Sequence, residues 1–320
     1  MSQLWPRFPV QSAGRVTQAA SLEGGSKASK KVAVVAFGGN ALLSRGEPLT
    51  MDAQWQNATK AGNGPQVGLL AVQDPATGLD VLDAESEGQI GYILETQLAN
   101  TLPGQEVVTL LTQTVVDPAD PAFKHPTKPI GATYDKQEAE RLAREKGWAI
   151  AADGNKWRRV VASPDPQAIL EARAIQLLLA NKVVPICCGG GGIPVAVDKE
   201  RHRRYGVEAV VDKDLASAVL AIKIKADWLL MLTDCDCIFD PEQWPDRKVP
   251  LPSPISPQQL RTHTFAAGSM APKVEAACRF VAATGGRAGV GRLEDAAAIL
   301  QGSKGTVVAP PPPGLAAPGR

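Results

Sequence analysis

The feature that most constrains this chain is an alternation of short β-branched apolar runs with stretches of helical period. This alternation is typical of an α/β domain in which an open, mostly parallel sheet carries helices on both faces. The predicted strands cover residues 32–37, 107–116, 183–188, 228–233 and 306–309. Gly or Asp follows each of the first four, and ligands of such sheets gather at the carboxyl ends of strands. We therefore expect binding residues in these loops.

Two helix starts are marked between the strands. Asp165, followed by a proline, is interpreted as an N-cap with a first-turn proline. Asp135 and Glu138 are interpreted as a capping box that opens a helix over residues 136–146. Residues 117–163 interrupt the alternation with Pro, Trp and charge. We predict that they form a small protruding subdomain.

Composition excludes several classes of partner. The chain has 320 residues, 44% of them hydrophobic, and a formal net charge of +1, so nothing indicates nucleic acid or a membrane surface. No apolar run approaches the roughly 20 residues that a membrane helix needs. The five cysteines form no CxxC pair and the three histidines are isolated, so we expect free thiols and no metal bound directly by the protein: Cys187, Cys188, Cys235, Cys237 and Cys278.

The two ends of the chain differ from the body. Residues 1–30 are basic and serine-rich with a single acid, which is typical of an organellar transit peptide and equally of an unstructured tail. Residues 310–320 are proline-rich and are expected to be a solvated extension. The expected location is the cytoplasm, or a plastid or mitochondrion if residues 1–30 are a transit peptide.

Three glycine turns lie at residues 38–40, 62–65 and 189–192, whereas Walker A and GxGxxG motifs are absent from the sequence. Glycine lets backbone N–H groups approach an anion without a Cβ in the way. One such turn is usually only a tight connection. Three turns, two of them directly after predicted strands, indicate anion binding.

Two lysines occupy unusual positions at predicted helix starts. Lys213 falls in the first turn of one helix, and Lys273 follows a proline that marks another. A cation there opposes the helix dipole by a few tenths to about 1 kcal/mol. Either a bound phosphate supplies the missing negative charge, or the lysines reach solvent while Asp212 and Asp214 neutralise Lys213.

Two other features are ambiguous when taken alone. Lys128 lies inside the inserted segment and is by itself an ordinary loop lysine. Residues 232–236 end the fourth strand with a hydroxyl and two carboxylates. They either contact a nucleotide or a magnesium shell, or simply turn the chain.

Together these segments closely resemble the carbamate kinases of the amino-acid-kinase family. The matching stretches run in family order and cover residues 36–42, 62–68, 128–131, 189–195, 211–216 and 268–276. The resemblance implies a three-layer sandwich over residues 31–309. In it, an acceptor-binding part at about 31–195 holds the subdomain 117–163, and a nucleotide-binding part covers about 196–309.

The resemblance also implies a reaction. That reaction is reversible phosphoryl transfer between ATP and carbamate, giving ADP and carbamoyl phosphate, with Mg²⁺ and in a homodimer. Lys213 and Lys273 would neutralise the transferring phosphoryl group, Asp214 would orient both lysines, and Lys128 would reach the acceptor. The substrate and phosphate would be held by Gly38, Gly39, Asn40, Gly62, Asn63, Gly64, Gly190 and Gly191, and the nucleotide by Thr233, Asp234, Met270 and Lys273.

One departure from the family pattern concerns a core strand. Lys60 and Ala61 run directly into Gly62, where family members carry the rest of a helix and a second core strand. A return strand of about five or six residues is needed to bring the loop at Gly62 to the ligand edge. We therefore expect one core strand to be missing near residue 61. Two alternatives stay open: another carboxylate kinase, such as one acting on acetylglutamate, or a catalytically impaired nucleotide-binding homologue.

Overall fold

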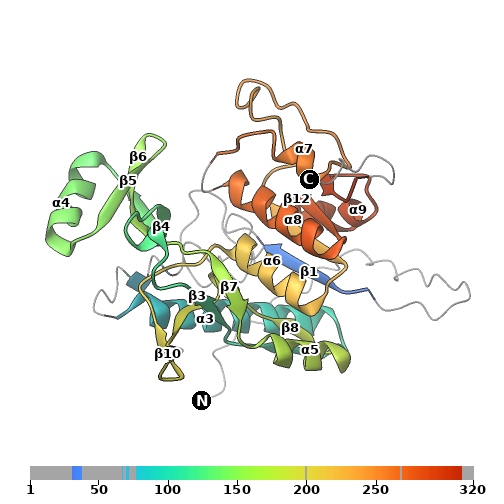
Figure 1. Ribbon diagram of the computed structural model, residues 1–320, viewed down its shortest axis with the longest axis horizontal. Coiled ribbons are helices and arrows are strands. Elements are labelled where there is room, and N and C mark those ends of the chain that lie inside the picture. The colour runs from blue at the N-terminus through green and yellow to red at the C-terminus, as the bar shows by residue number, and fades with distance from the viewer. Residues whose placement is uncertain are drawn as a thin grey trace, which may run out of the picture. The chain divides into compact units, whose positions relative to one another are not determined.

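The fold was taken from a computed structural model that describes residues 31–37, 67, 70–71, 77–198, 200–266 and 269–311. Within these residues it is a mixed α/β structure with several parallel strand pairs (Figure 1). The predicted class of fold is confirmed.

The first sheet has the strand order β1-β11-β12-β13, formed by Ala33–Phe37, Trp228–Thr233, Arg287–Arg292 and Thr306–Val308. The first three strands are parallel, and β13 is antiparallel to β12. Successive residues of β11 face opposite sides of the sheet, so Leu229 and Met231 join one apolar cluster and Leu230 and Leu232 another. Both faces are therefore buried, as predicted for a parallel sheet.

Helices cover both faces of this sheet. Helices α6 (Lys213–Ile224) and α8 (Met270–Thr284) contact each other and share the cluster of Leu229 and Met231. On the opposite face, helix α9 (Ala296–Leu300) contributes Ile299. Ile90 of helix α3 (Leu79–Thr101) contacts Phe37 of β1, which also belongs to that opposite face. The result is three layers.

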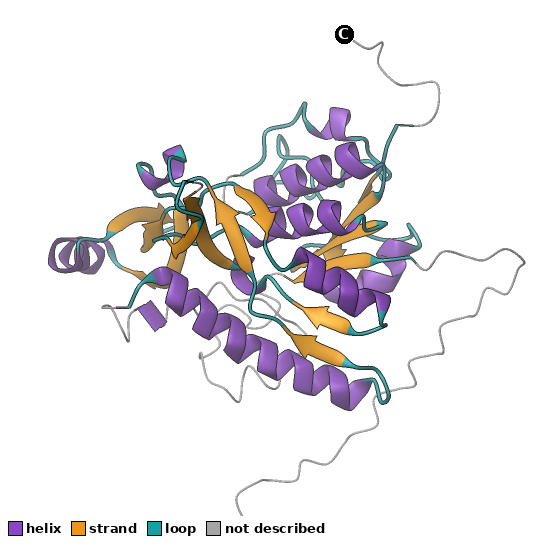
Figure 2. Cartoon of the chain, turned by 60° about the horizontal axis from the view of Figure 1, so that its bottom comes forward, coloured by secondary structure: helices purple, strands orange, loops and turns teal. Residues whose placement is uncertain are grey.

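The remaining strands of the body form two further sheets. β2 (Val107–Thr109) and β8 (Val184–Ile186) make a parallel pair, and the long helix α3 lies against it (Figure 2). The other sheet has the order β10-β9-β3-β7, formed by Arg203–Gly206, Ile193–Asp198, Gln113–Val116 and Pro166–Ile169. Helix α5 (Ala172–Ala180) contacts α6 and β8.

Two expectations from the sequence were wrong in detail. The single strand predicted over residues 107–116 is divided into β2 and β3, which belong to different sheets. No Gly or Pro marks the break, because it is made by tertiary hydrogen bonds at Thr112. Asp165 is not a helix N-cap: the residues after it form β7, and its carboxylate instead accepts hydrogen bonds from Arg279.

The segment predicted to be inserted forms its own sheet of order β4-β6-β5, from Lys128–Tyr134, Lys156–Val161 and Ala149–Asp153, joined by helix α4 (Lys136–Lys146) (Figure 1). Asp135 is the N-cap of α4 and accepts the Glu138 N–H at 2.8 Å, as predicted. The Glu138 side chain bonds to Arg141. Shorter helical turns lie at Pro121–Phe123 (η3), Gly189–Gly191 (η4), Pro257–Leu260 (α7) and Leu293–Asp295 (η5).

The central sheet is in two pieces within the described ranges. There, β1 pairs with β11 alone, and β2 pairs with β8 alone, so no strand joins the two groups. The residues of the connection near residue 61 lie outside the described ranges. The strand predicted to be missing there stays a prediction.

Candidate active site

Both unusual lysines lie at helix starts, as predicted. Lys213 is the first residue of α6, and Lys273 lies in the first turn of α8. Asp212 is the N-cap of α6, and its Oδ1 accepts the N–H groups of Asp214 and Leu215 at 2.9 and 3.3 Å. This cap fixes the direction in which α6 begins.

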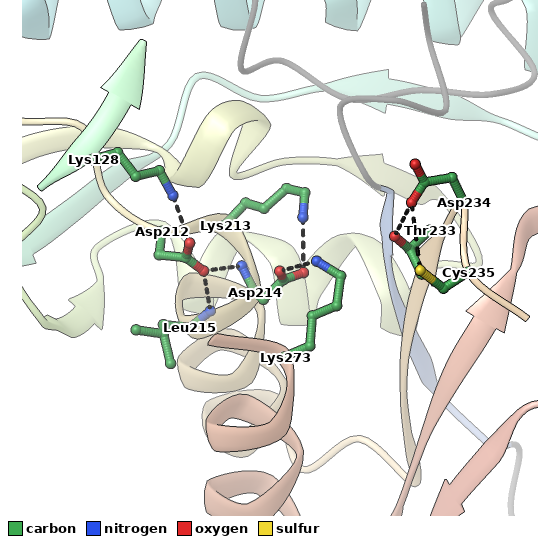
Figure 3. A network of polar contacts seen from close by, with 9 residues as sticks. All are labelled: Lys128, Asp212, Lys213, Asp214, Leu215, Thr233, Asp234, Cys235 and Lys273. Atoms are coloured by element: carbon green, nitrogen blue, oxygen red, sulfur yellow. Dashed lines mark hydrogen bonds and ion pairs between the residues drawn. The ribbon is translucent and has the colours of Figure 1, made fainter. Parts of the chain in front are cut away.

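A single carboxylate joins the two lysines (Figure 3). Asp214 Oδ1 lies 2.9 Å from Lys213 Nζ, and Asp214 Oδ2 lies 2.8 Å from Lys273 Nζ. The side chains are 3% exposed for Asp214, 20% for Lys213 and 11% for Lys273. The two lysines therefore do not reach freely into solvent, but Asp214 does neutralise Lys213, as that alternative expected.

Burial and charge act against each other in this group. Burial raises the pKa of the Asp214 carboxyl, but the two ammonium groups outweigh burial and hold its pKa below the ordinary value. The pKa of Lys213 is lowered by burial, and nearby Lys273 adds to this effect. The pKa of Lys273 is raised because Asp214 outweighs burial. Asp214 is thus held as an anion between two cations.

Lys128 reaches this group from the inserted segment. It is the first residue of β4, and its Nζ lies 2.5 Å from Asp212 Oδ2 (Figure 3). Burial raises the pKa of Asp212, but Lys128 outweighs it and lowers that pKa below the ordinary value. Three lysines are therefore gathered by two aspartates, which leaves an excess of one positive charge.

The predicted nucleotide-contacting residues lie beside this group. Thr233 ends β11, and its hydroxyl donates to Asp234 Oδ1 at 3.1 Å (Figure 3). Asp234 is close enough to raise the pKa of Lys273. Met270 begins α8 and contacts the apolar cluster beneath.

The third glycine turn lies next to the start of α6. Gly190, Gly191 and Gly192 have positive φ values of 68°, 116° and 83°, which favour glycine. The Gly191 N–H donates to Cys188 O within the turn. The other predicted phosphate-binding residues lie outside the described ranges: Gly38, Gly39, Asn40, Gly62, Asn63 and Gly64.

Sequence reasoning missed two acidic residues of this region. Asp212 was considered only as a neighbour of Lys213, although an Asp before a helix start is an N-cap signal. Glu87, in the middle of α3, accepts the Gly189 N–H at 2.9 Å. No local pattern in the sequence distinguishes it from an ordinary helical glutamate.

The arrangement suits the binding of a multiply charged anion. Ammonium groups and a glycine turn meet where the helices begin, and helix N-termini favour negative charge. Within the described ranges, no group of three or more His, Cys, Asp or Glu residues is placed to hold a metal ion. The five cysteines are free thiols. No helix among the described residues is long and apolar enough to cross a bilayer.

Comparison with known proteins defines the class. The model of the amino acid kinase family matches residues 31–290, and the chain belongs to that family. A carbamate kinase of Rhizobium meliloti is 48% identical over 300 residues, covering 86% of this chain and 92% of that protein. Within the family the chain groups with the carbamate kinases, and it is a phosphotransferase.

Solved structures agree with this placement. A Giardia lamblia carbamate kinase bound to citric acid has a TM-score of 0.81 at 36% identity, covering 88% of this chain and 99% of that one. The same enzyme bound to AMP-PNP has a TM-score of 0.76 at 37% identity, with the same coverage. The alignment with the R. meliloti protein has 300 positions, but it covers only 86% of the 320 residues of this chain. Some aligned positions are therefore gaps in this chain. That relative therefore carries residues that this chain lacks.

Proposed function

We propose that this chain transfers a phosphoryl group reversibly between ATP and carbamate, giving ADP and carbamoyl phosphate. The observation that carries the proposal is the bond of one buried carboxylate, Asp214, to the ammonium groups of both Lys213 and Lys273. Phosphoryl transfer needs alignment and charge stabilisation more than covalent chemistry. Cations fixed at two helix starts supply both.

Each lysine has a separate part in this proposal. Lys213 and Lys273 neutralise the equatorial oxygens of the transferring group, and Asp214 keeps them apart and oriented. Lys128 exchanges its partner Asp212 for the anionic acceptor. No general base is required, because the carbamate oxygen is already an anion.

Mg²⁺ is proposed to enter with the nucleotide. Magnesium usually keeps several waters and binds one or two carboxylates together with substrate phosphates, so it does not require an all-protein cage. Asp234, after β11 and close to Lys273, fits such a role. When bound, the metal neutralises charge on the β- and γ-phosphates.

The test is the formation of ATP from ADP and carbamoyl phosphate by the full chain. We expect Lys213→Met and Lys273→Met each to lower kcat by about 100-fold or more, because each removes a group that stabilises transition-state charge. Lys223→Met is the matched control, since Lys223 is an exposed lysine of the same helix α6. Unchanged kcat in both variants would reject the proposed roles.

A second candidate is a homologue that binds nucleotide without turnover. The division of the central sheet favours this candidate. Without a return strand, the glycine loop at Gly62 would not be brought to the ligand edge. Nucleotide binding measured by calorimetry distinguishes the two candidates. A folded wild-type sample that binds ADP but forms no ATP would support this candidate and reject the kinase.

We also propose a homodimer. Large apolar side chains are exposed on or next to α3, α5 and β8, and both helices contact β8. Exposed apolar side chains that cluster mark interaction sites. We propose that these residues contribute to the dimer interface, and they are named here the α3–α5 face: Tyr92, Leu102, Leu111, Leu177 and Val184.

The location of the mature protein is proposed to be the cytoplasm, unless residues 1–30 direct it to an organelle. Those residues lie outside the described ranges. Mass determination of the protein isolated from its source distinguishes the two, because removal of a transit peptide shortens the chain.

A further inference from the structure

The glycine turn beside Lys213 is held by a buried carboxylate from another layer. Glu87 Oε1 accepts the Gly189 N–H at 2.9 Å and the Thr112 hydroxyl at 2.5 Å, and Oε2 accepts the Thr112 N–H at 3.0 Å. The Thr112 hydroxyl in turn accepts the Cys188 N–H at 2.6 Å. One glutamate and one threonine thus bind the first residue of the turn and the residue before it.

The turn is also confined sterically on three sides. A Cβ added to Gly189 would lie 2.8 Å from Glu87 Cγ, and one added to Gly192 would lie 2.3 Å from Thr114 Oγ1. A Cβ added to Gly191 would lie 2.3 Å from the carbonyl oxygen of Val211. Val211 directly precedes the N-cap Asp212. A shift of the turn would therefore push against the start of α6, which carries Lys213.

We propose that Glu87, acting through Thr112, is a positioning residue for the phosphoryl site, because it fixes the glycine turn against the start of α6. This inference rests on the proposed function, in which Lys213 contacts the transferring group, and on the expectation from the sequence that Gly190 and Gly191 hold the phosphate. Glu87 itself contacts neither, since its carboxylate is occupied by Thr112 and Gly189.

The three hydrogen bonds that Glu87 accepts agree with this role. Burial raises the pKa of its carboxyl to about 7, while the hydrogen bonds from Thr112 and Gly189 act in the opposite direction. The groups that face it are Asp83 on the same helix and Glu171, the residue before α5. An ionised carboxylate accepts all three hydrogen bonds, whereas a neutral amide of the same size cannot.

The experiment compares Glu87→Gln with Glu95→Gln. In Glu87→Gln, one oxygen is replaced by an NH₂ group that faces another donor, the Thr112 N–H. Glu95 is the matched control: it lies about two turns further along α3, and its Oε2 accepts the Thr109 N–H at 2.8 Å, away from the turn. Both variants lose a carboxylate that binds a backbone N–H of the sheet region.

Steady-state kinetics give the decisive readout. We expect Glu87→Gln to raise the KM for carbamoyl phosphate about tenfold, the effect of one lost charged hydrogen bond, with KM for ADP within about twofold of wild type. Glu95→Gln should leave both KM values within about twofold. Wild-type KM for carbamoyl phosphate in folded Glu87→Gln, or an equal rise in Glu95→Gln, would overturn the inference.

A second pair of variants decides the matter if Glu87→Gln does not fold. Thr112→Val is nearly isosteric but lacks the hydroxyl, whereas Thr112→Ser keeps it. The positioning role requires the KM for carbamoyl phosphate to rise in Thr112→Val and to return towards wild type in Thr112→Ser. Equal KM values in the two variants would contradict it.

A binding measurement separates this inference from the proposed function. Calorimetry with carbamoyl phosphate requires no turnover. Wild-type protein that binds carbamoyl phosphate more tightly than Glu87→Gln, yet forms no ATP, would reject the kinase reaction and retain the positioning role. Active wild-type protein with equal binding in both forms would retain the kinase and reject the positioning role.

Discussion

At the scale of single residues, Asp214 is the group on which the cation arrangement depends. Two ammonium groups at helix starts repel each other and oppose both helix dipoles. A carboxylate with one oxygen bonded to each lysine offsets that repulsion. Removing one partner of such a buried group typically costs 3–5 kcal/mol, because a charge is left without compensation. The same residue therefore stabilises the fold and holds both lysines in the place where we propose that they bind an anion.

Glu87 leads to a prediction about the pH dependence of stability. Its pKa of about 7 in the folded chain is above the ordinary value of 4.5, so its contribution is fully present below pH 4.5 and is lost as pH rises through 7. We expect wild type to lose up to about 3 kcal/mol of unfolding free energy relative to Glu87→Gln over this range. Urea unfolding at pH 5 and pH 8 measures it.

The control for this measurement is Glu95→Gln, which removes a carboxylate from the same helix. The same pH dependence in wild type and Glu87→Gln would show that Glu87 is not the titrating group. Asp83 contributes in both proteins, since burial raises the pKa of its carboxyl as well.

At the scale of elements, the division of the central sheet is the main departure from an ordinary parallel sheet. Strand β1 and the β2-β8 pair belong to different sheets, and no strand within the described ranges joins them. Unpaired strand edges invite pairing with other chains. Val35 of β1 and Val184 of β8 are 39% and 38% exposed.

An insertion tests this feature. A strand-length segment of about five or six β-branched residues inserted after Ala61 is expected to raise both Tm and turnover, because it supplies the chain with a return strand. The control is a Gly/Ser segment of equal length at the same position, which adds chain length without β propensity. Equal effects of the two insertions on Tm and turnover would show that the missing strand is not the cause.

At the scale of the whole molecule, the α3–α5 face is the surface at which we propose that copies of the chain associate. Tyr92 and Leu177 are its most exposed large apolar residues, at 56% and 58%. We expect sedimentation velocity to give a dimer for wild type and a monomer for the double variant Tyr92→Lys/Leu177→Lys, because introduced charge disfavours burial of the face. Tyr205→Lys, an exposed aromatic on β10, is the control. A dimer that persists in the double variant would place the interface elsewhere.

The sequence by itself determined the α/β class, the positions of β1, β8, β11 and β13, and the helix starts that carry Lys213 and Lys273. These features depend on local signals: β-branched runs, stretches of helical period and a proline in a first turn. The matching motifs also indicated the carbamate kinases and the part played by Asp214. Such local signals depend on neighbouring residues and not on contacts between distant parts of the chain.

Only the tertiary structure decided which distant groups meet. Glu87 and Gly189 are 102 positions apart, so no spacing in the sequence indicates their contact. Lys273 and Asp214 are 59 positions apart, and only the family resemblance indicated that they meet. The break at Thr112 between β2 and β3 has the same origin, because the N–H and the hydroxyl of Thr112 donate to Glu87 rather than to a neighbouring strand. Propensity acts over a few neighbouring residues, whereas a buried carboxylate takes whichever donors the packed layers bring to it.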